Sequence, residues 1–515
     1  MHFFDMEEKM MTRTIDTSST IPPRTACHNL TRLCIPCALL WLAACNVEEN
    51  GSTVGNTVEG AALLALVKAA GLTGDPASGR SLPSIDDPKA QLGKQLFFTR
   101  GLGGDADSAC VSCHHPALGG GDNLSLSIGV GAEIPALLGP GRFHDGAAIH
   151  FDGGPTVPRN APTTFNIGMW DQALFQDGRV ESLGKTPDRN GDDALGIRTP
   201  DSDFGVADPN AGATLAAAQS RFPVTSPEEM RGFTFEAGNS NDAVRASLAR
   251  KLSNAGGWDA EFTAAFGDPT ITYERIAEAI AEYERSQVFV NSPWKAFVEG
   301  NNNAISESAK RGAMKFFTNI EAGGANCVSC HSGDFFTDEK YHVLATPQIG
   351  RGKGDDNGIL SNDDFGRFRE TGVAADKYRF RTPTLLNVEV TGPWGHAGAY
   401  TSLEGIVLHM LNPAETVANY DFSQLDPNIQ AGDMLINTQF ALDQLEANRV
   451  DKVSGVHRDV VFTDDDVTDL VEFLKTLTDP CVKDRGCLAP WIPGASDVDP
   501  DGLRLHAIDN TGALL

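Results

Sequence analysis

Cys327-Val328-Ser329-Cys330-His331 and Cys110-Val111-Ser112-Cys113-His114 are two copies of one short pattern, C-x-x-C-H. In this pattern two thiols bond covalently to the vinyl groups of a haem, and the adjacent histidine becomes an axial ligand of its iron. A redox dithiol does not need the histidine, a zinc half-site would need a second ligand pair nearby, and chance matches are rare at this cysteine and histidine content. We therefore expect two covalently bound c-type haems, held by these cysteines and histidines.

The composition of the chain argues against some partners. Its 515 residues include 41 Lys and Arg against 69 Asp and Glu, which gives a net charge of -28. This acidic excess argues against nucleic acid and is compatible with a basic redox partner, although it is more often only a solvated surface. The length and the 41% hydrophobic content predict a large core and more than one domain.

The N-terminal region resembles an export signal. Two arginines precede an apolar run, residues 33–44, that is too short for a stable membrane anchor. The run ends in Leu42-Ala43-Ala44-Cys45, which is similar to a bacterial lipoprotein box. Residues 1–44 should then be removed and Cys45 should carry a lipid, with an ordinary secretory signal as the alternative. Either form predicts an exported protein, in the periplasm or, as a lipoprotein, on the outer membrane or cell surface.

The remaining cysteines can be assigned by elimination. Of ten in the chain, three lie in the leader, Cys45 takes the lipid and four hold haem. Cys481 and Cys487 are left, and in an oxidising compartment a small structural disulfide in a loop is the natural interpretation.

Apolar periodicity predicts helices separated by long loops. The clearest patterns are residues 61–67, 91–98, 274–283 and, after Thr463 as a helix cap, 464–474. Strand patterns are few, so the fold class should be mainly α. Residues 185–213 are rich in Asp, Gly, Asn and Pro with little periodicity, which predicts a surface insertion.

Four further motifs occur in order along the chain: Arg159-Asn160-Ala161-Pro162-Thr163, Asp177-Gly178-Arg179, Arg381-Thr382-Pro383-Thr384-Leu385-Leu386-Asn387 and Thr391-Gly392-Pro393-Trp394-Gly395-His396. With them the chain resembles the bacterial di-haem cytochrome c peroxidase family, which includes MauG, from about Leu92 to Leu477. The resemblance implies two cytochrome c-like domains. One haem is the peroxide site, and the other stores and relays electrons.

The resemblance also suggests domain boundaries. After the leader, residues 45–90 form an N-terminal linker or extension, and residues 91–270 form the first, peroxidatic haem domain with its insertion. Residues 271–480 form the second, electron-transfer haem domain, and residues 481–515 a C-terminal extension.

For the second haem, the resemblance implies an iron ligand opposite His331. In the family this ligand follows the Pro-x-x-His stretch at a fixed interval, as Met in peroxidases and Tyr in MauG, and the interval leads here to Met410. A thioether favours reduced iron and raises its potential, which suits an electron reservoir. Two alternatives are that Met410 is core packing on a helix, and that the neighbouring His409 binds instead.

For the first haem, the resemblance assigns Glu229 as the carboxylate that moves protons between peroxide oxygens, with Gln219 and Pro223 lining the same pocket. The residues alone favour another role. Ser226-Pro227-Glu228-Glu229 has the pattern of a helix capping box, with Ser226 as N-cap and Glu229 at the third helical position. The interval from Gln219 to Glu229 matches the family and favours catalysis.

Two positions depart from the family pattern. Many of the peroxidases close the first haem with a histidine, and the matching residue here is Val130, so the site is either open or closed by His144 or His150. The family commonly has a Trp between the haems where this chain has Gln176. Electron transfer between the haems would then need Trp170 or the haem edges themselves.

A third metal is implied only by the resemblance. Family members hold calcium between the domains through an Asn side chain and backbone carbonyls, which here are Asn160, Thr391 and Pro393. Oxygen ligands suit calcium. The alternative is that Asn160 is a turn residue and the other two belong to an ordinary loop.

These expectations describe an exported oxidoreductase that reduces hydrogen peroxide to water with electrons from a small redox protein, a cytochrome c or a cupredoxin. Its only membrane contact would be the lipid anchor. One alternative is a MauG-like enzyme that oxidises side chains of a partner protein. Another is a di-haem electron carrier without catalytic activity, whose haems would be six-coordinate and inert to peroxide.

Overall fold

The computed structural model describes residues 58–151, 153–355 and 362–515. The predicted leader and Cys45, the predicted site of the lipid, lie outside these residues, so both stay predictions. The described residues belong to one compact unit. None of the helices in the described residues combines the length and the apolar character needed to cross a bilayer.

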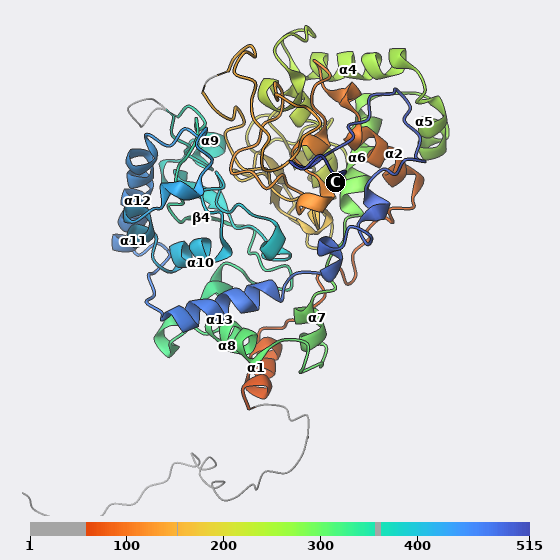
Figure 1. The fold of residues 1–515 in the computed structure, drawn as a ribbon. Helices are drawn as coiled ribbons and strands as arrows, with labels where there is room; N and C mark the ends of the chain where they lie inside the picture. Colours follow the sequence, from red (N-terminus) through yellow and green to blue (C-terminus); the bar gives the residue numbers. More distant parts are fainter. Residues whose placement is uncertain (1–57, 152, 356–361) are drawn as a thin grey trace, which may run out of the picture. The chain divides into compact units, whose positions relative to one another are not determined.

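The described chain is mainly helical, as predicted (Figure 1). Its α-helices are α1 Val58–Ala69, α2 Pro88–Phe98, α3 Leu215–Gln219, α4 Asn241–Ala255, α5 Asp259–Phe266, α6 Tyr273–Arg285, α7 Pro293–Val298, α8 Glu307–Phe317, α9 Phe368–Thr371, α10 Leu403–Leu411, α11 Pro413–Ala418, α12 Met434–Val450 and α13 Asp464–Lys475. Long loops and short 3₁₀ turns join them. All four periodic segments predicted from the sequence are helical.

Strands are short. An antiparallel sheet has the order β1-β2-β3, with β1 Ala173–Leu174, β2 Val180–Ser182 and β3 Ile197–Arg198. A second antiparallel pair joins β4 Tyr341–Val343 to β5 Arg379–Arg381.

The first core is built around α2 and α6, which lie side by side in Figure 1. The two helices approach closely at Gly93, where an added Cβ would lie 1.9 Å from the carbonyl oxygen of Ala279. Phe97 follows one turn later and packs on Tyr283 with ring centroids 5.0 Å apart. The 3₁₀ turn that carries Cys110 begins after this helix, so the crossing of α2 and α6 supports the first C-x-x-C-H motif.

The second core repeats this design with α8 and α13. At Gly312 an added Cβ would lie 1.9 Å from the carbonyl oxygen of Asp469. Phe316 and Phe317 follow at the end of α8, and they join Trp294, Phe336 and Phe473 in a buried aromatic cluster. Thr463 caps α13 in a capping box with Asp466, which confirms the predicted cap.

These cores suggest different domain limits from those expected. Because α6 packs on α2 in the first core, we propose that the first haem domain extends through Arg285 rather than ending at residue 270. Helix α1, expected in a linker, places Leu63 and Val67 in the second core with no exposed surface. Within the segment 185–213, the two residues of β3 are buried and pair with β2, whereas Leu195, Phe204 and Val206 are exposed, so the surface insertion stays a prediction.

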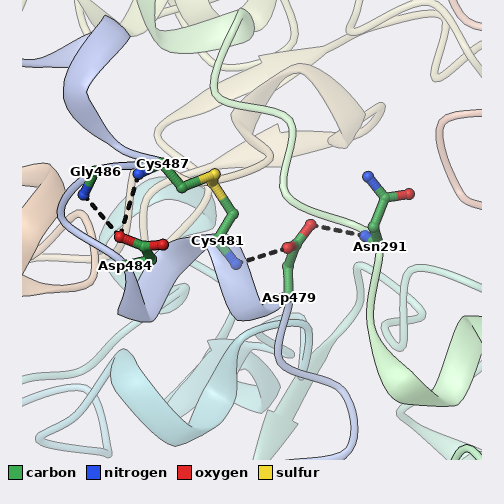
Figure 2. Close-up of a disulfide and its surroundings, with 6 residues drawn as sticks. All are labelled: Asn291, Asp479, Cys481, Asp484, Gly486 and Cys487. Carbon is green, nitrogen blue, oxygen red and sulfur yellow. Dashed lines mark hydrogen bonds between the residues drawn. A yellow bond between two sulfur atoms is a disulfide. The ribbon is translucent and has the colours of Figure 1, made fainter.

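The C-terminal extension packs on the first core rather than standing apart, through residues that include Val482, Leu488 and Leu505. The predicted disulfide is present between Cys481 and Cys487 (Figure 2). Asp479 holds the beginning of the turn that carries Cys481, because it accepts hydrogen bonds from the backbone N–H groups of Cys481 and Asn291, at 2.9 and 2.8 Å. The bridge therefore lies where the chain passes from one core to the other.

Candidate haem sites and the first cavity

The histidines of the two C-x-x-C-H motifs are held in the same way. Nδ1 of His114 donates to the carbonyl oxygen of Gly120 at 3.2 Å, and Nδ1 of His331 donates to that of Phe336 at 3.0 Å. A carbonyl can only accept, so both rings carry their proton on Nδ1 and keep a lone pair on Nε2. Burial lowers the pKa of both histidines, which keeps them neutral. Each is thus prepared to bind a metal through Nε2.

The segments that support these histidines are related as well. The Thr163 hydroxyl donates to the Gly119 carbonyl oxygen and the Thr384 hydroxyl to that of Phe335, both at 2.6 Å. Three residues later in each segment an asparagine, Asn166 or Asn387, adopts a left-handed backbone with φ of 61°. The motifs around Pro162 and Pro383 therefore have the same role, since each supports the loop beside one of the two motif histidines.

The motif thiols fit haem attachment better than the alternatives. All four cysteines are free of disulfides. Reactive C-x-x-C dithiols have lowered pKa values, whereas burial raises the pKa of Cys113 and of Cys327 to about 12. Among the described residues, the His, Cys, Asp and Glu side chains that converge as a possible metal site are Cys330, Asp338 and His342. This group uses a motif cysteine and offers no second thiol pair for zinc.

A cavity opens beside the first motif. Three of its lining residues, Cys110, Cys113 and His114, belong to the motif. The wall also contains five ionisable side chains, which are Arg159, Arg179, Glu229, Glu284 and Lys353.

Glu229 lines this cavity, and its carboxylate is not used as a helix cap. Ser226 does cap the turn Pro227–Arg231, because its hydroxyl accepts from the backbone N–H of Glu229 at 3.3 Å. The reciprocal half of the predicted capping box is missing, since the N–H of Ser226 donates to the carbonyl oxygen of Pro223. The turn closes with wide π-type hydrogen bonds, a geometry that is frequent at functional sites. The Glu229 carboxyl group can therefore act in the cavity.

The electrostatics of Glu229 follow from its position. Burial raises the pKa of its carboxyl group, Arg179 and Lys353 lower it, and Glu228 raises it. Gln219, at the end of α3, and Pro223, at the start of the next turn, line the same cavity. The structure thus brings together the three residues that the resemblance assigned to peroxide chemistry.

Two of the sequence motifs meet in a buried ion pair at the cavity edge. Arg159 donates two hydrogen bonds to Asp364, at 2.6 and 2.8 Å, and one to Asp177 at 2.6 Å. Asp177 belongs to the Asp-Gly-Arg motif, whose Arg179 stacks over the ring of Phe175 at 3.4 Å. The carboxylates hold Arg159 in place. Arg179 also donates to Asp177, at 3.3 Å, and together with Lys353 it lowers the pKa of Glu229.

The histidines proposed to close the first site lie elsewhere. His144 is bonded to the carbonyl oxygen of Asp145, and exposed His150 stacks on Phe233 with centroids 4.1 Å apart. Val130 is buried and its N–H donates to the carbonyl oxygen of Glu228. Among the described residues that line the cavity, the one imidazole is that of His114. This arrangement favours an open site.

Gln176 and Trp170 occupy different surroundings. Gln176 lines the cavity, and its carbonyl oxygen accepts from the N–H of Arg381 at 2.8 Å. Trp170 lies in the second core, with the Arg381 guanidinium 3.5 Å from its ring centroid and Phe335 packed edge-on. Arg381 thus links the wall of the first cavity to an aromatic pair beside the second motif.

His409 is committed to other partners and does not compete with Met410. Its Nδ1 lies 2.9 Å from the Tyr400 hydroxyl, and its Nε2 donates to the carbonyl oxygen of Leu344 at 2.9 Å. Met410, in the last turn of α10, is partly buried against the second core, and its carbonyl oxygen accepts from His457 at 2.7 Å. Met410 stays the predicted ligand of the second haem.

The expected calcium ligands lie in two loops. The Asn160 amide donates to the carbonyl oxygens of Leu124 and Ser125, at 2.9 and 3.2 Å, and its backbone N–H donates to that of His396. The side-chain bonds use the amide nitrogen of Asn160. The donor set is chemically suitable, and calcium stays a prediction.

The cavity wall contains two ionisable residues that the sequence patterns did not predict there, Glu284 and Lys353. Glu284 lies on the apolar face of α6, one turn after Ile280, and this carboxylate within an apolar stripe was an available signal. Lys353 lies in a loop without periodicity, and no sequence signal placed it in the cavity.

Comparisons with known proteins agree with the site. Residues 87–303 match the family described as di-haem cytochrome c peroxidase. The methylamine utilization protein MauG of Methylorubrum extorquens is 28% identical over 337 residues, which cover 65% of this chain and 71% of MauG. Cytochrome c551 peroxidase of Pseudomonas aeruginosa is 26% identical over 328 residues, covering 64% of this chain and 73% of the peroxidase.

Solved structures share the fold. The diheme peroxidase BthA of Burkholderia thailandensis matches with a TM-score of 0.51 and 22% identity, over 84% of this chain and 92% of BthA. A MauG-like protein associated with microbial copper homeostasis matches with a TM-score of 0.51 and 20% identity, over 82% of this chain and 97% of that protein. With two C-x-x-C-H motifs on a repeated scaffold, the chain is similar to both branches of the bacterial di-haem cytochrome c peroxidase and MauG family.

Proposed function

We propose that this protein reduces hydrogen peroxide to water with electrons from a small redox protein, a cytochrome c or a cupredoxin. The reaction consumes one peroxide, two electrons and two protons and yields two waters. The observation that carries the proposal is the position of Glu229, whose carboxyl group lines the same cavity as His114, Cys110 and Cys113 and is not used as a cap.

The residues of the cavity have separate tasks in this reaction. Glu229 takes a proton from one peroxide oxygen and returns it to the other, which becomes the leaving water. Arg179 and Lys353 favour the carboxylate form that can accept this proton. Gln219 and Pro223 shape the space in front of the carboxylate. The first haem would supply the iron that reduces peroxide, and the second haem would supply stored electrons.

The haem ligands follow from the same proposal. His114 and His331 each offer Nε2 to an iron, and Met410 offers its thioether to the second iron. For calcium we propose the Asn160 side chain with the carbonyls of Thr391 and Pro393. We also propose export, with Cys45 as the lipid-bearing first residue of the mature protein. Mass spectrometry of the membrane fraction tests this, and an unmodified mature protein beginning elsewhere would contradict the anchor.

The decisive experiment compares two neighbouring carboxylates in the purified holoenzyme. Glu229→Gln keeps the size and the capped backbone N–H, so the protein should fold and bind both haems while peroxide turnover falls by about 10²-fold or more. Glu228→Gln is the matched control, because Glu228 does not line the cavity, and its turnover should stay close to that of the native protein. Normal turnover in Glu229→Gln would remove the catalytic role.

Spectra separate this function from its alternatives. An open first site predicts high-spin iron in the fully oxidised protein and reaction with peroxide without prior reduction. Low-spin, peroxide-inert haems would instead identify an electron carrier. A MauG-like oxidase is the second candidate, favoured because the described residues of the cavity wall include no histidine other than His114. It predicts slow turnover with small electron donors and peroxide-dependent oxidation of a partner protein.

A further inference from the structure

Glu284 is a second carboxyl group in the first cavity, and the reaction proposed above leaves it unused. It lies near the C-terminal end of α6 with only 4% of its surface exposed, and it lines the cavity with Ile280. Its Oε2 has no hydrogen-bond partner among the described residues. A buried polar atom without a partner in a native protein calls for an explanation, such as a group that binds there or a proton that comes and goes.

Within the part of the chain that the structure describes, no cation acts on Glu284 to hold it as a carboxylate. Ser220 interacts with the carboxyl group, and Cys110 faces it from the first motif. On its own helix, the Tyr283 hydroxyl donates to the carbonyl oxygen of Trp491, and the Tyr273 hydroxyl donates to that of Ser220.

Two arginines that act on Tyr273 of the same helix are already paired. Arg221 bonds to Asp208, and Arg245 bonds to Asp201 and Asp242 at 2.7 and 2.8 Å. The other charged groups on the cavity wall are Glu229, Arg159, Arg179 and Lys353, described above. Glu284 is therefore a carboxyl group whose charge is set mainly by its burial and by what the cavity contains.

Burial raises the pKa of Glu284 to about 8, and the hydrogen bond with Ser220 lowers it. Without another charge in the cavity the group is then mostly protonated at neutral pH. A positive charge in the same poorly solvated cavity favours the carboxylate, and the removal of that charge favours the protonated form.

We propose that Glu284 is the redox-linked proton acceptor of the first haem. An oxidised haem bound in this cavity would supply the positive charge that favours the Glu284 carboxylate. On one-electron reduction of that haem, Glu284 would take up one proton from water, and reoxidation would release it. The added negative charge and the added proton cancel, so the cavity gains no net charge. The device would also bring one proton into the cavity with an electron, where peroxide reduction consumes protons and electrons in equal number.

This inference depends on the assignment of the first haem to Cys110, Cys113 and His114, but not on peroxide turnover. Its test is the midpoint potential of that haem in the intact holoenzyme, followed spectroscopically from about pH 5 to about pH 10. In the native protein the potential should fall as pH rises. Glu284 should have one pKa in the oxidised protein and a higher pKa in the reduced protein. At pH values between these two, the midpoint potential should fall by up to about 59 mV per pH unit, which for one electron corresponds to a tenfold change in the equilibrium constant.

Three variants make the assignment specific. Glu284→Gln should abolish the slope and hold the potential near the acidic limit of the native protein, because the amide resembles the protonated carboxyl group. Glu284→Asp should restore part of the slope. Glu274→Gln changes an exposed carboxylate on the same helix and should follow the native curve. A flat native curve, or a slope that persists in Glu284→Gln, would overturn the inference.

A second measurement covers the case in which Glu284→Gln fails to assemble. Reduced-minus-oxidised infrared spectra of Glu229→Gln, which lacks the other cavity carboxyl group, should show a protonated carboxyl band that grows on reduction. Its absence would overturn the inference. Loss of turnover in Glu229→Gln together with a flat native potential curve would contradict only this inference, whereas a sloping potential without peroxide turnover would contradict only the proposed function.

Discussion

The two C-x-x-C-H regions are nearly alike on the histidine side and unlike on the opposite side. Behind His114 and His331 the same elements recur: a carbonyl acceptor for Nδ1, a threonine that braces the loop and a helix pair that crosses at a glycine. Beyond the first histidine lies a cavity with carboxylates and cations. The second core instead contains Met410 and a buried aromatic cluster. One scaffold can therefore hold two haems, and the residues facing each haem decide its chemistry.

The difference is electrostatic in origin. Ionisable side chains in a poorly solvated cavity can move protons and stabilise developing charge, which peroxide reduction requires. An apolar environment with a thioether favours the reduced iron and gives protons no place to bind. The first region is thus equipped for proton-linked chemistry and the second for storing electrons.

The most direct test of the repeated scaffold removes one attachment thiol at a time. Cys110→Ser and Cys327→Ser should each impair haem attachment at their own site, so that mass spectrometry finds one covalent haem instead of two in most molecules. If either substitution removed both haems, the two scaffolds would depend on each other for assembly.

Met410 tests the opposite side of the second haem. Met410→Ala should abolish the thioether-to-iron absorption band and lower the potential of the second haem, because a ligand that favours reduced iron is lost. Met314→Ala is the matched control, since Met314 is also partly buried against the second core. A potential unchanged by Met410→Ala would show that Met410 is only core packing.

Lys353 tests the charge balance around Glu229. The pKa of Lys353 is lowered to about 8 by burial and by Arg159 and Arg179, and its charge in turn lowers the pKa of Glu229. Lys353→Met should therefore raise the pKa of Glu229, so that less of it is ionised at acid pH. The acid limb of the kcat/KM profile should move to higher pH. Lys340 is exposed, so Lys340→Met should leave the pH profile unchanged. If the acid limb did not move in Lys353→Met, Lys353 would not control the ionisation of Glu229.

The smallest expected effect concerns the paired threonines. Thr163→Val and Thr384→Val each leave one partly buried carbonyl without its hydroxyl donor, which should cost about 1 kcal/mol of unfolding free energy. Thermal unfolding of the holoenzyme should show similar losses for both. A large difference between them would show that the scaffolds are alike in geometry but not in stability.

The sequence carried most of the information on the haem sites and less on the domains. C-x-x-C-H specifies haem chemistry through local spacing, and helical periodicity located α2, α6 and α13. Which helix pairs with which depends on tertiary contacts that periodicity does not encode. For this reason α6 was expected in the second domain although it packs on α2. The capping signature of Ser226 was half correct, because the alternative acceptor, the Pro223 carbonyl, comes from a turn that the pattern does not specify.

The backbone link between Phe98 and Leu505 has a consequence for the order of assembly. The N–H of Leu505 donates to the carbonyl oxygen of Phe98 at 2.8 Å, and the N–H of Arg100 donates to that of Leu503 at 3.0 Å. A chain made and exported from its N-terminus therefore presents the first C-x-x-C-H motif long before the segment that closes over α2 has emerged. Attachment at Cys110 can then take place on an open, incomplete core, and arrival of residues 503–505 would seal it. The first site should consequently be the last part of the molecule to reach its final form.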